Sequence, residues 1–391
     1  QDLRNVPAYV IEGKKLRPLS TSSNAYGNEA TGVPNTAAIN ALASSTPISS
    51  TPHAPDIFLD TVIDKENGIG SFASLHSVDV IQLAQSKRFV IANSLFMDGL
   101  IGDAQSWRAF WSQVGAYSLL ELATIGGKDT LIPAVPYNRS TGAIQSLITI
   151  NALFNQGNIL EGSLKEEFTD YGTNAEDVIV TVIFRDGSRN ATFPSNASVQ
   201  IKLANTLEVN AIRETIDASQ FVTTRAQAIM IGKLLCNTRR YVRRSIEFQT
   251  FPTDSAVQPG SFIYVETSNN QWEGLYTGRV EAGGALNIPI GTTVPNGTYN
   301  ALTYTSSSGV QSFSGVSVTG NTAAALAARA GDLFVLGTAV RNKRVFRIIE
   351  ISMEEEGETT IKAVEHPCDT NGNSLIVAGL TNPSSTLFTI S

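Results

Sequence analysis

The chain has 391 residues, of which 42% are hydrophobic and 16% charged, and its formal net charge is −7. This length predicts roughly two to four compact units, and the apolar content excludes a largely disordered chain. The excess of acidic residues argues against stable binding to nucleic acid, although it is compatible with DNA sliding through a pore.

The small number of cysteines and the lack of long apolar runs exclude further classes of protein. Cys236 and Cys368 are the only cysteines, too few for a disulfide scaffold or for a zinc site with paired ligands. No run approaches the roughly 20 apolar residues of a membrane span, and no leader opens the chain, so we expect neither membrane insertion nor export by a signal peptide. Because Gln1 stands in place of an initiator Met, we expect the sequence to begin inside a longer or processed polypeptide.

The N-terminal part, residues 1–56, is expected to contain an irregular arm. Between residues 20 and 55 the composition shifts to Ser, Thr, Ala, Asn and Pro with few large apolar residues. Such a segment predicts a long loop that cannot form a core of its own. An arm that crosses to a neighbouring subunit is the alternative, and we favour the loop.

Order is expected to resume at residues 57–59 and to continue in an amphipathic helix. Asp103 can cap a helix on which Trp107, Phe110, Trp111 and Val114 lie at spacings of 3, 4 and 7. An aromatic stripe can also serve as a sugar or base platform, but helical spacing favours one buried face.

Two β-structures follow. Residues 119–125 and 130–135 flank the turn at 126–129 and predict a hairpin. Residues 178–184 have the β-branched density of a strand that is buried on both faces, and the strand is expected to stop at Asp186.

A second helix is predicted after a capping box. Thr224 and Gln227 form the box, and the residues that follow leave almost no polar face, so this helix should lie between layers. It runs into the basic cluster at residues 239–244, whose four arginines flank one tyrosine. The cluster could meet phosphate, but arginines at a helix C-terminus also complement the helix dipole and supply salt bridges between subunits, and we favour this second role.

The rest of the chain is predicted to be sheet. Strands between turn residues are expected at 246–251, 261–267, 275–281, 333–336, 345–353 and 358–364. Together they predict a β-barrel or sandwich, with the acidic run 354–357 at a hairpin tip. Residues 283–331 are rich in Gly, Thr, Ser and Asn and predict an inserted β-module.

The sequence predicts no catalytic, cofactor-binding or metal-binding residues. The segment 68–73 matches a relaxed dinucleotide fingerprint, but the polar residues 64–67 stand where a strand should lead into the first glycine. His53, His76 and His366 lack spaced partner ligands. Four neighbouring acids at the hairpin tip do not face each other across a groove, as glycosidase carboxylates do; they are Glu354, Glu355, Glu356 and Glu358. The four Asn-x-Ser/Thr triplets are expected chance matches.

The order of several elements resembles that of a known family. The elements are residues 221–228, the helix up to Arg244, the turn 258–261, Trp272, and residues 278–280. They resemble the tail tip attachment family, which includes host specificity protein J of lambda-like phages. Residues 344–366 look like that family's closing hairpin, and 60–70 look like its segment ending in Gly-x-Gly. The resemblance covers about 60–369, and Ser261 departs from it, because the family usually has Asp there.

The resemblance implies a fold and a domain order. The fold would be mainly β with α+β subdomains, built from tandem hub domains of barrel or sandwich type that form a ring. The expected divisions are 1–56 for the N-terminal segment and arm, 57–210 for an α+β hub subdomain, 211–282 with 332–391 for the β-barrel hub domain, and 283–331 for the inserted module.

The resemblance also implies partners and a location. Three copies would form a ring in the virion, at the tip of a phage tail that is assembled in the host cytoplasm. Distal tail or tail tube proteins would lie above the ring and tail fibres or a spike below it. The tape measure protein and, in transit, DNA would occupy its lumen. Two alternatives stay open: a polysaccharide-degrading enzyme, which needs carboxylates converging in a cleft, and a glycan-binding adhesion module, which needs exposed aromatic residues on a concave face.

Overall fold

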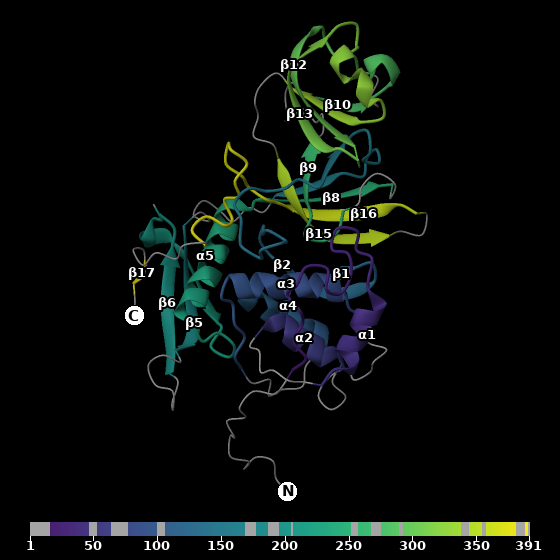
Figure 1. Ribbon diagram of the computed structural model, residues 1–391. Helices are drawn as coiled ribbons and strands as arrows, with labels where there is room; N and C mark the ends of the chain where they lie inside the picture. Colours follow the sequence, from purple (N-terminus) through teal and green to yellow (C-terminus); the bar gives the residue numbers. More distant parts are fainter. Residues whose placement is uncertain are drawn as a thin grey trace.

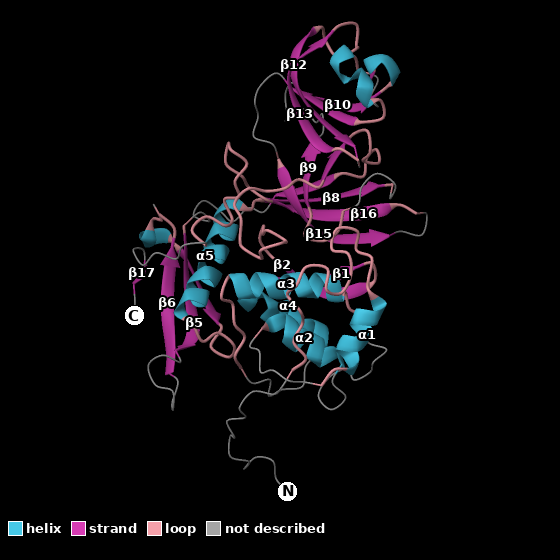
Figure 2. Cartoon of the chain, viewed as in Figure 1, coloured by secondary structure: helices cyan, strands magenta, loops and turns pink. Residues whose placement is uncertain are grey.

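The computed structural model describes residues 16–46, 53–63, 77–99, 106–168, 177–186, 195–204, 206–251, 257–266, 275–288, 292–305, 307–337, 344–353, 357–380 and 388–389. Within these ranges the protein is mainly β, with a group of helices at one end (Figures 1 and 2). Within the same ranges, no helix combines the length and the apolar character needed to cross a membrane. The strands and helices confirm the expected class in so far as it is mainly β with α+β parts.

Four helices and a hairpin form the helical part of the molecule. The helices are α1 (Thr36–Ser44), α2 (Ala54–Ile63), α3 (Val80–Ala92) and α4 (Trp107–Val114), and the hairpin consists of β1 (Leu120–Ile125) and β2 (Lys128–Pro133). Polar caps start two of the helices: the side chain of Asn35 accepts from Ala38 N, and that of Asp79 accepts from Gln82 N. The caps satisfy backbone N–H groups that have no partner within the helix.

The expected irregular arm is only partly irregular. Residues 36–44 form helix α1, and Leu19, Tyr26 and Leu42 belong to the largest apolar core. Composition suggested a loop because the apolar residues are few, but α3 supplies the missing partners. Lys87 Nζ of α3, for example, donates to the Leu19 carbonyl at 2.8 Å.

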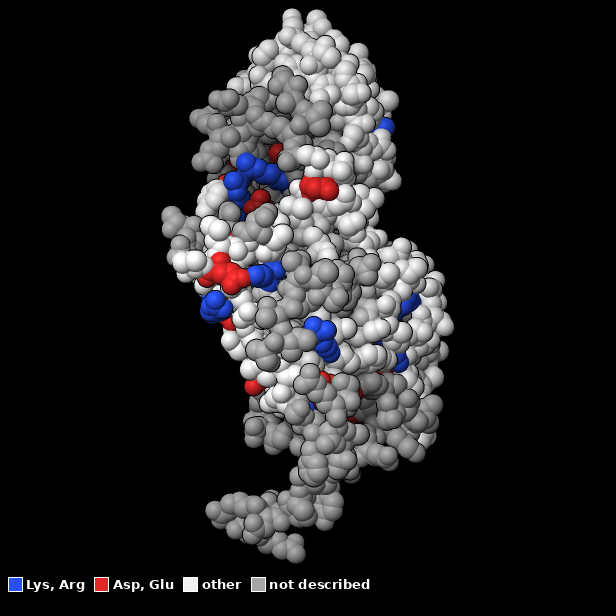
Figure 3. Space-filling model, turned by 90° about the vertical axis from the view of Figure 1, so that its left-hand side faces the viewer, with Lys and Arg blue, Asp and Glu red and all other residues white. Residues whose placement is uncertain are grey.

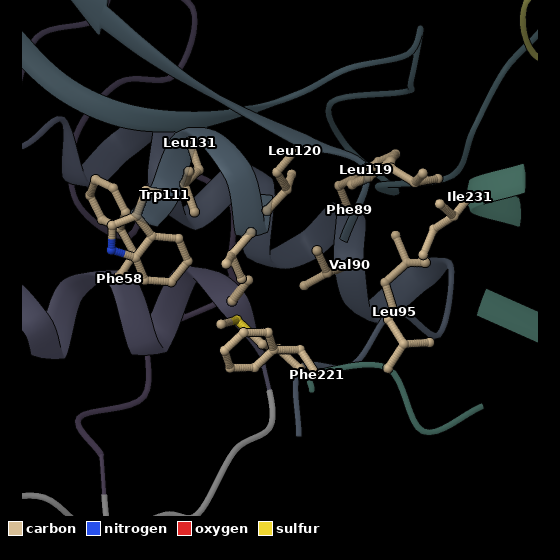
Figure 4. Close-up of a cluster of buried hydrophobic side chains, with 14 of the residues drawn as sticks. Phe58, Phe89, Val90, Leu95, Trp111, Leu119, Leu120, Leu131, Phe221 and Ile231 are labelled. Atoms are coloured by element: carbon tan, nitrogen blue, oxygen red, sulfur yellow. The ribbon is translucent and has the colours of Figure 1, made fainter. Parts of the chain in front are cut away.

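Helix α4 buries the predicted stripe. Phe110, Trp111 and Val114 are buried, and Trp111 is 0% exposed (Figure 4). Trp107 is half-buried, and its Nε1 donates to Thr61 Oγ1 at 2.9 Å. The buried face is thus confirmed, whereas the expected cap, Asp103, lies outside the described residues.

The hairpin β1–β2 forms as predicted. Its strands pair from Leu120 with Pro133 to Ile125 with Lys128. Gly126 and Gly127 connect them with φ of 56° and 77°. Two successive positive φ angles are what a type I′ turn requires, and glycine adopts them without a steric penalty.

A four-stranded sheet lies beside the helical part. Its order is β17-β6-β5-β7, with β5 at Val178–Asp186, β6 at Ser195–Lys202, β7 at Ile212–Asp217 and β17 at Phe388–Thr389. The long helix α5 (Arg225–Tyr241) packs on β5 and β6. Strand β5 is buried on both faces over its first three residues only, and burial alternates from Thr181 onward. The prediction of a strand buried on both faces therefore holds for its start.

Half of the predicted capping box forms at α5. Thr224 Oγ1 accepts from Gln227 N at 3.4 Å. The carboxamide of Gln227 does not close the box, because it accepts from Phe96 N at 3.0 Å and donates to the carbonyls of Phe96 and Tyr117 at 2.8 Å. These bonds connect α5 to the helical part, a tertiary role that spacing along the sequence cannot reveal.

The central sheet has six strands in the order β3-β9-β15-β16-β8-β4. The strands are β3 (Ala152–Asn155), β4 (Lys165–Phe168), β8 (Arg244–Thr250), β9 (Phe262–Glu266), β15 (Val345–Met353) and β16 (Thr359–Glu365). At the turn before β9, Ser261 Oγ accepts from Gln258 N at 3.1 Å. The serine thus supplies an acceptor at the position where the resembled family usually has Asp.

A five-stranded sheet projects from the central one (Figure 1). Its order is β11-β10-β14-β12-β13, with β10 at Leu275–Val280, β11 at Leu286–Asn287, β12 at Gly297–Thr305, β13 at Gly309–Val318 and β14 at Leu333–Gly337. It has an apolar core of its own, in which Val316 and Phe334 are buried.

The boundaries between the sheets differ from the domain boundaries that we expected from the sequence. Strands β3 and β4, placed in the range 57–210, pair with β9 and β8 of the central sheet. Strands β10 and β14, placed in the barrel ranges, pair with each other, and β14 also pairs with β12 of the projecting sheet. Local sequence identifies a strand but not its partner, because pairing between distant strands is set by tertiary packing.

Candidate subunit interface

An apolar segment is exposed beside the four-stranded sheet. Leu207 is 68% exposed, Val209 is 95% exposed and Ile212 is 40% exposed. They lie on the short 3-10 helix Glu208–Asn210 and its two ends, immediately before and at the start of β7. Three large apolar side chains so close together on a surface are typical of a site that another protein covers.

Strand β7 forms a free edge of that sheet. It pairs in parallel with β5 on one side, and no other described strand pairs with it. Ile212 N donates to Asp177 O at 2.8 Å, so the backbone groups of the alternate residues Arg213 and Thr215 face away from β5. An uncovered edge with exposed apolar neighbours is a surface that can pair with a further chain.

The opposite edge of the same sheet is formed by a short strand. Strand β17 pairs with β6, with Phe388 opposite Ile201 and Thr389 opposite Gln200. The two edges of this sheet therefore differ in length, because β17 has two residues and β7 has six.

The basic cluster at the end of α5 is engaged within the chain. Arg239 Nε lies 3.0 Å from Glu214 Oε1, and Arg240 donates to the Ala204 carbonyl at 3.0 Å. Arg244 pairs with Glu166 at 2.8 Å, and its guanidinium lies 4.5 Å from the Phe168 ring centroid. On the face shown in Figure 3, basic side chains lie beside acidic ones and do not form a continuous patch. These contacts support a structural role for the arginines. The partners are residues of the same chain, whereas we expected salt bridges between subunits.

Two further charged groups extend this cluster into the central sheet. Burial raises the pKa of Glu365, and nearby Arg244 and Arg344 partly oppose that shift. Burial lowers the pKa of Arg344, and the positive charge of Arg244 lowers it further. The charged side chains of Arg344 and Glu365 are therefore partly shielded from water where β8, β15 and β16 meet.

A buried arginine joins the central sheet to the helical part. Arg347 of β15 is 4% exposed, and it donates to Glu121 Oε2 at 2.7 Å and to the Pro133 carbonyl at 3.0 Å. Beside this contact lies a cavity of about 420 Å³. Its described lining consists of Gln82, Ile132, Pro133, Val135, Pro136, Tyr137, Asn138, Arg139, Ser140, Gln145, Thr149, Asn151, Gln258, Pro259, Gly260 and Phe262.

The described histidines and cysteines do not form a site of their own, and the ring of His366 contacts Phe262 of the cavity lining, with centroids 4.8 Å apart. His53 stacks on Phe96, His366 is buried at the end of β16, and His76 lies outside the described ranges. Among the described residues, no group of three or more potential ligands could hold a metal ion. Burial raises the pKa of both Cys236 and Cys368 to about 12, so at neutral pH both remain thiols.

Two other segments singled out from the sequence cannot be placed. The glycine pair of residues 68–73 and the acidic residues 354–356 lie outside the described ranges. Gly357, just after the acidic run, has a φ of 82° in the connection between β15 and β16. The hairpin that we predicted around the acidic run is therefore present, with paired strands on both sides.

Sequence reasoning did not single out Leu207, Val209 or Arg347. The first two are isolated apolar residues in a polar stretch, and nothing in their spacing separates an exposed position from a buried one. Arg347 stands within the strand pattern of 345–353, where a charge predicts a solvent-facing residue. It is buried because a hairpin more than two hundred positions away in the chain covers it.

We expect His366 to make stability depend on pH. Burial, and secondarily Arg347, lowers its pKa to about 3, and its Nε2 lies 2.7 Å from Ser374 Oγ. The unfolded chain binds this proton near the ordinary histidine pKa and the folded chain does not, so the free energy of unfolding should fall as pH drops below about 6.5. Denaturant titrations should show that the wild type loses up to about 1.4 kcal/mol per pH unit more than His366→Gln. Parallel pH profiles of the two proteins would contradict this assignment.

Comparison with known proteins finds similarity among solved structures, but none among family models or curated proteins. No protein-family model matches the sequence, and no curated protein matches it. A chain of the virion of a native gene transfer agent (GTA) particle aligns at 12% identity with a TM-score of 0.36, over 73% of this chain and 47% of that chain. The tail protein from Neisseria meningitidis MC58 aligns at 10% identity with a TM-score of 0.31, over 70% and 59%. The chain spans less than two thirds of either protein, and TM-scores of this size do not establish a shared fold.

Proposed function

We propose that this chain is a structural subunit of a bacteriophage tail, three copies of which close a ring at the distal end. The observation that carries the proposal is the exposed apolar segment beside the open edge of β7, where Val209 is 95% exposed. In the proposed ring, a neighbouring subunit covers this surface with a different surface of its own, which is a head-to-tail contact. Head-to-tail contacts form rings when the rotation closes.

The arrangement of the segments that resemble the tail tip attachment family supports the proposal. Residues 221–228 lead into α5, the turn 258–261 leads into β9, and residues 344–366 contain the hairpin β15–β16. The turn and the hairpin also touch, because Gly260 N donates to the Ile348 carbonyl at 2.8 Å. Segments that are distant in the sequence thus lie together in one body, as expected of a shared architecture.

In this role the function is mechanical. The ring would connect tail tube proteins above to fibres or a spike below, with the tape measure protein in its lumen, and would open for DNA passage through a change of subunit packing. A net charge of −7 favours sliding of DNA over adsorption. We propose no catalytic activity: the acid pair of a polysaccharide hydrolase must face a groove, and the described lining of the cavity contributes no acid.

The oligomeric state of the purified chain tests this proposal. Native mass spectrometry should give a mass three times the 41.7 kDa of one chain. Val209→Asp places a charge in the covered contact and should shift the population to monomer. Val33→Asp changes another exposed residue, 62% exposed on the N-terminal segment, and should leave the trimer intact. A wild-type monomer or closed dimer, or a trimer that survives Val209→Asp, would refute the ring.

A further inference from the structure

The cavity at the contact between the helical part and the central sheet has the size of a small-molecule site. Its volume of about 420 Å³ falls in the range of roughly 300–1,000 Å³ that such sites occupy. Three stretches of the chain line it, within residues 132–140, 145–151 and 258–262, together with Gln82 of α3. Neither the proposed ring contact nor the Arg347 contact requires this space.

One carboxamide in the cavity lining, that of Gln82, has a side-chain oxygen to which no described residue donates a hydrogen bond. Gln82 lines the cavity and is 6% exposed. Its Nε2 donates to the Tyr137 hydroxyl at 3.4 Å, whereas no described residue donates to its side-chain oxygen. That oxygen is not among the described polar atoms that are buried without a partner, so solvent reaches it, and a ligand in the cavity with a hydroxyl or N–H group can donate to it.

The charge of the cavity lining is distinctive for a protein of net charge −7. Arg139 is its one charged side chain among the described residues, which include no acid, lysine or histidine. An arginine can bind a carboxylate through two parallel hydrogen bonds. The lining therefore favours a ligand that carries one negative group. The ligand can also carry neutral polar groups, because nothing in the lining repels them.

The remaining polar groups are mostly carboxamides. Carboxamides come from Asn138, Gln145, Asn151 and Gln258, and hydroxyls from Tyr137, Ser140 and Thr149. A carboxamide both donates and accepts, as does each hydroxyl of a sugar, so these groups pair well. Apolar side chains, Ile132 and Val135 among them, supply the surface on which the C–H face of a sugar ring can pack.

We propose that this cavity binds a monosaccharide unit that carries a carboxylate, of the uronic acid class. The carboxylate pairs with Arg139, a ring hydroxyl donates to the side-chain oxygen of Gln82, and the carboxamides of Gln145 and Gln258 engage the other hydroxyls. No bond is made or broken. This binding is independent of the proposed ring, because the cavity is lined by one chain.

Calorimetric titration of the full chain with D-glucuronate, D-glucose and the acetylated dipeptide Ac-Gly-Gly tests the site. We expect glucuronate to bind with a Kd on the order of 1 mM, and glucose and the dipeptide at least about tenfold more weakly. Arg139→Ala should reduce glucuronate binding to the level of glucose. Gln82→Leu should weaken both sugars about tenfold, and should it fail to fold, Gln145→Ala should weaken both in the same direction.

The matched control is Arg225→Ala, which removes an exposed arginine at the start of α5, outside the described lining of the cavity, and should leave glucuronate binding unchanged. Failure of glucuronate to bind at tens of millimolar would overturn the proposal. So would glucuronate binding that survives Arg139→Ala, or dipeptide binding that equals and competes with the sugar, since the ligand would then be a peptide carboxylate. None of these results bears on the trimer, so the two proposals fail separately.

Discussion

Replacement of Trp111 by alanine is expected to lower the free energy of unfolding by about 3–5 kcal/mol. The side chain is 0% exposed and touches two other aromatic rings, Phe58 with centroids 5.2 Å apart and Phe110 at 5.1 Å. The variant loses the burial of the indole and leaves a cavity that helices α2 and α4 cannot fill. Urea denaturation followed by circular dichroism measures the loss.

The control on the same helix is Ser112→Ala, because Ser112 lies on the exposed face of α4. Its effect should stay within about 0.5 kcal/mol. Equal stability of Trp111→Ala and the wild type would show that this stripe is not a core, and would revive the glycan-binding alternative, which requires these aromatic residues at the surface.

Replacement of Lys87 by methionine should cost about 3–5 kcal/mol of stability. Lys87 Nζ lies 2.9 Å from Asp56 Oδ2, and the two side chains are 6% and 0% exposed. Both groups also hold the N-terminal segment: Lys87 donates to the Leu19 carbonyl, and Asp56 Oδ1 accepts from Leu19 N at 2.8 Å. Removal of the ammonium leaves a buried carboxylate without its counter-charge and frees the segment from α3.

Two comparisons isolate this effect. Lys165→Met breaks a surface pair with Glu247, whose side chains are 71% and 36% exposed, and should cost less than about 1 kcal/mol. The double variant Lys87→Met with Asp56→Leu should regain part of the stability lost in the single variant, because it buries no unpaired charge. Similar losses for Lys87→Met and Lys165→Met would mean that the buried pair contributes no more than an exposed one.

Local patterns were sufficient for most individual elements. The stripe that contains Trp111, the diglycine turn at 126–127 and the strand runs from residue 246 onward all fold as predicted. In each case the determining interaction lies within a few residues: helical spacing, positive φ at glycine, or β-branched density. Where a partner was needed from elsewhere in the chain, prediction failed, as for α1, whose apolar residues pack on distant helices.

The sequence by itself determined the β-rich composition, the order of the elements and the resemblance to tail tip proteins, because these depend on residue types and their spacing. The tertiary structure alone decided which strands share a sheet, why Arg347 and Gln227 are buried, and which surfaces remain open. Val209 beside the free edge of β7 and the recessed Gln82 belong to this second group. Exposure is a property of what the rest of the chain covers, and no local pattern contains that information.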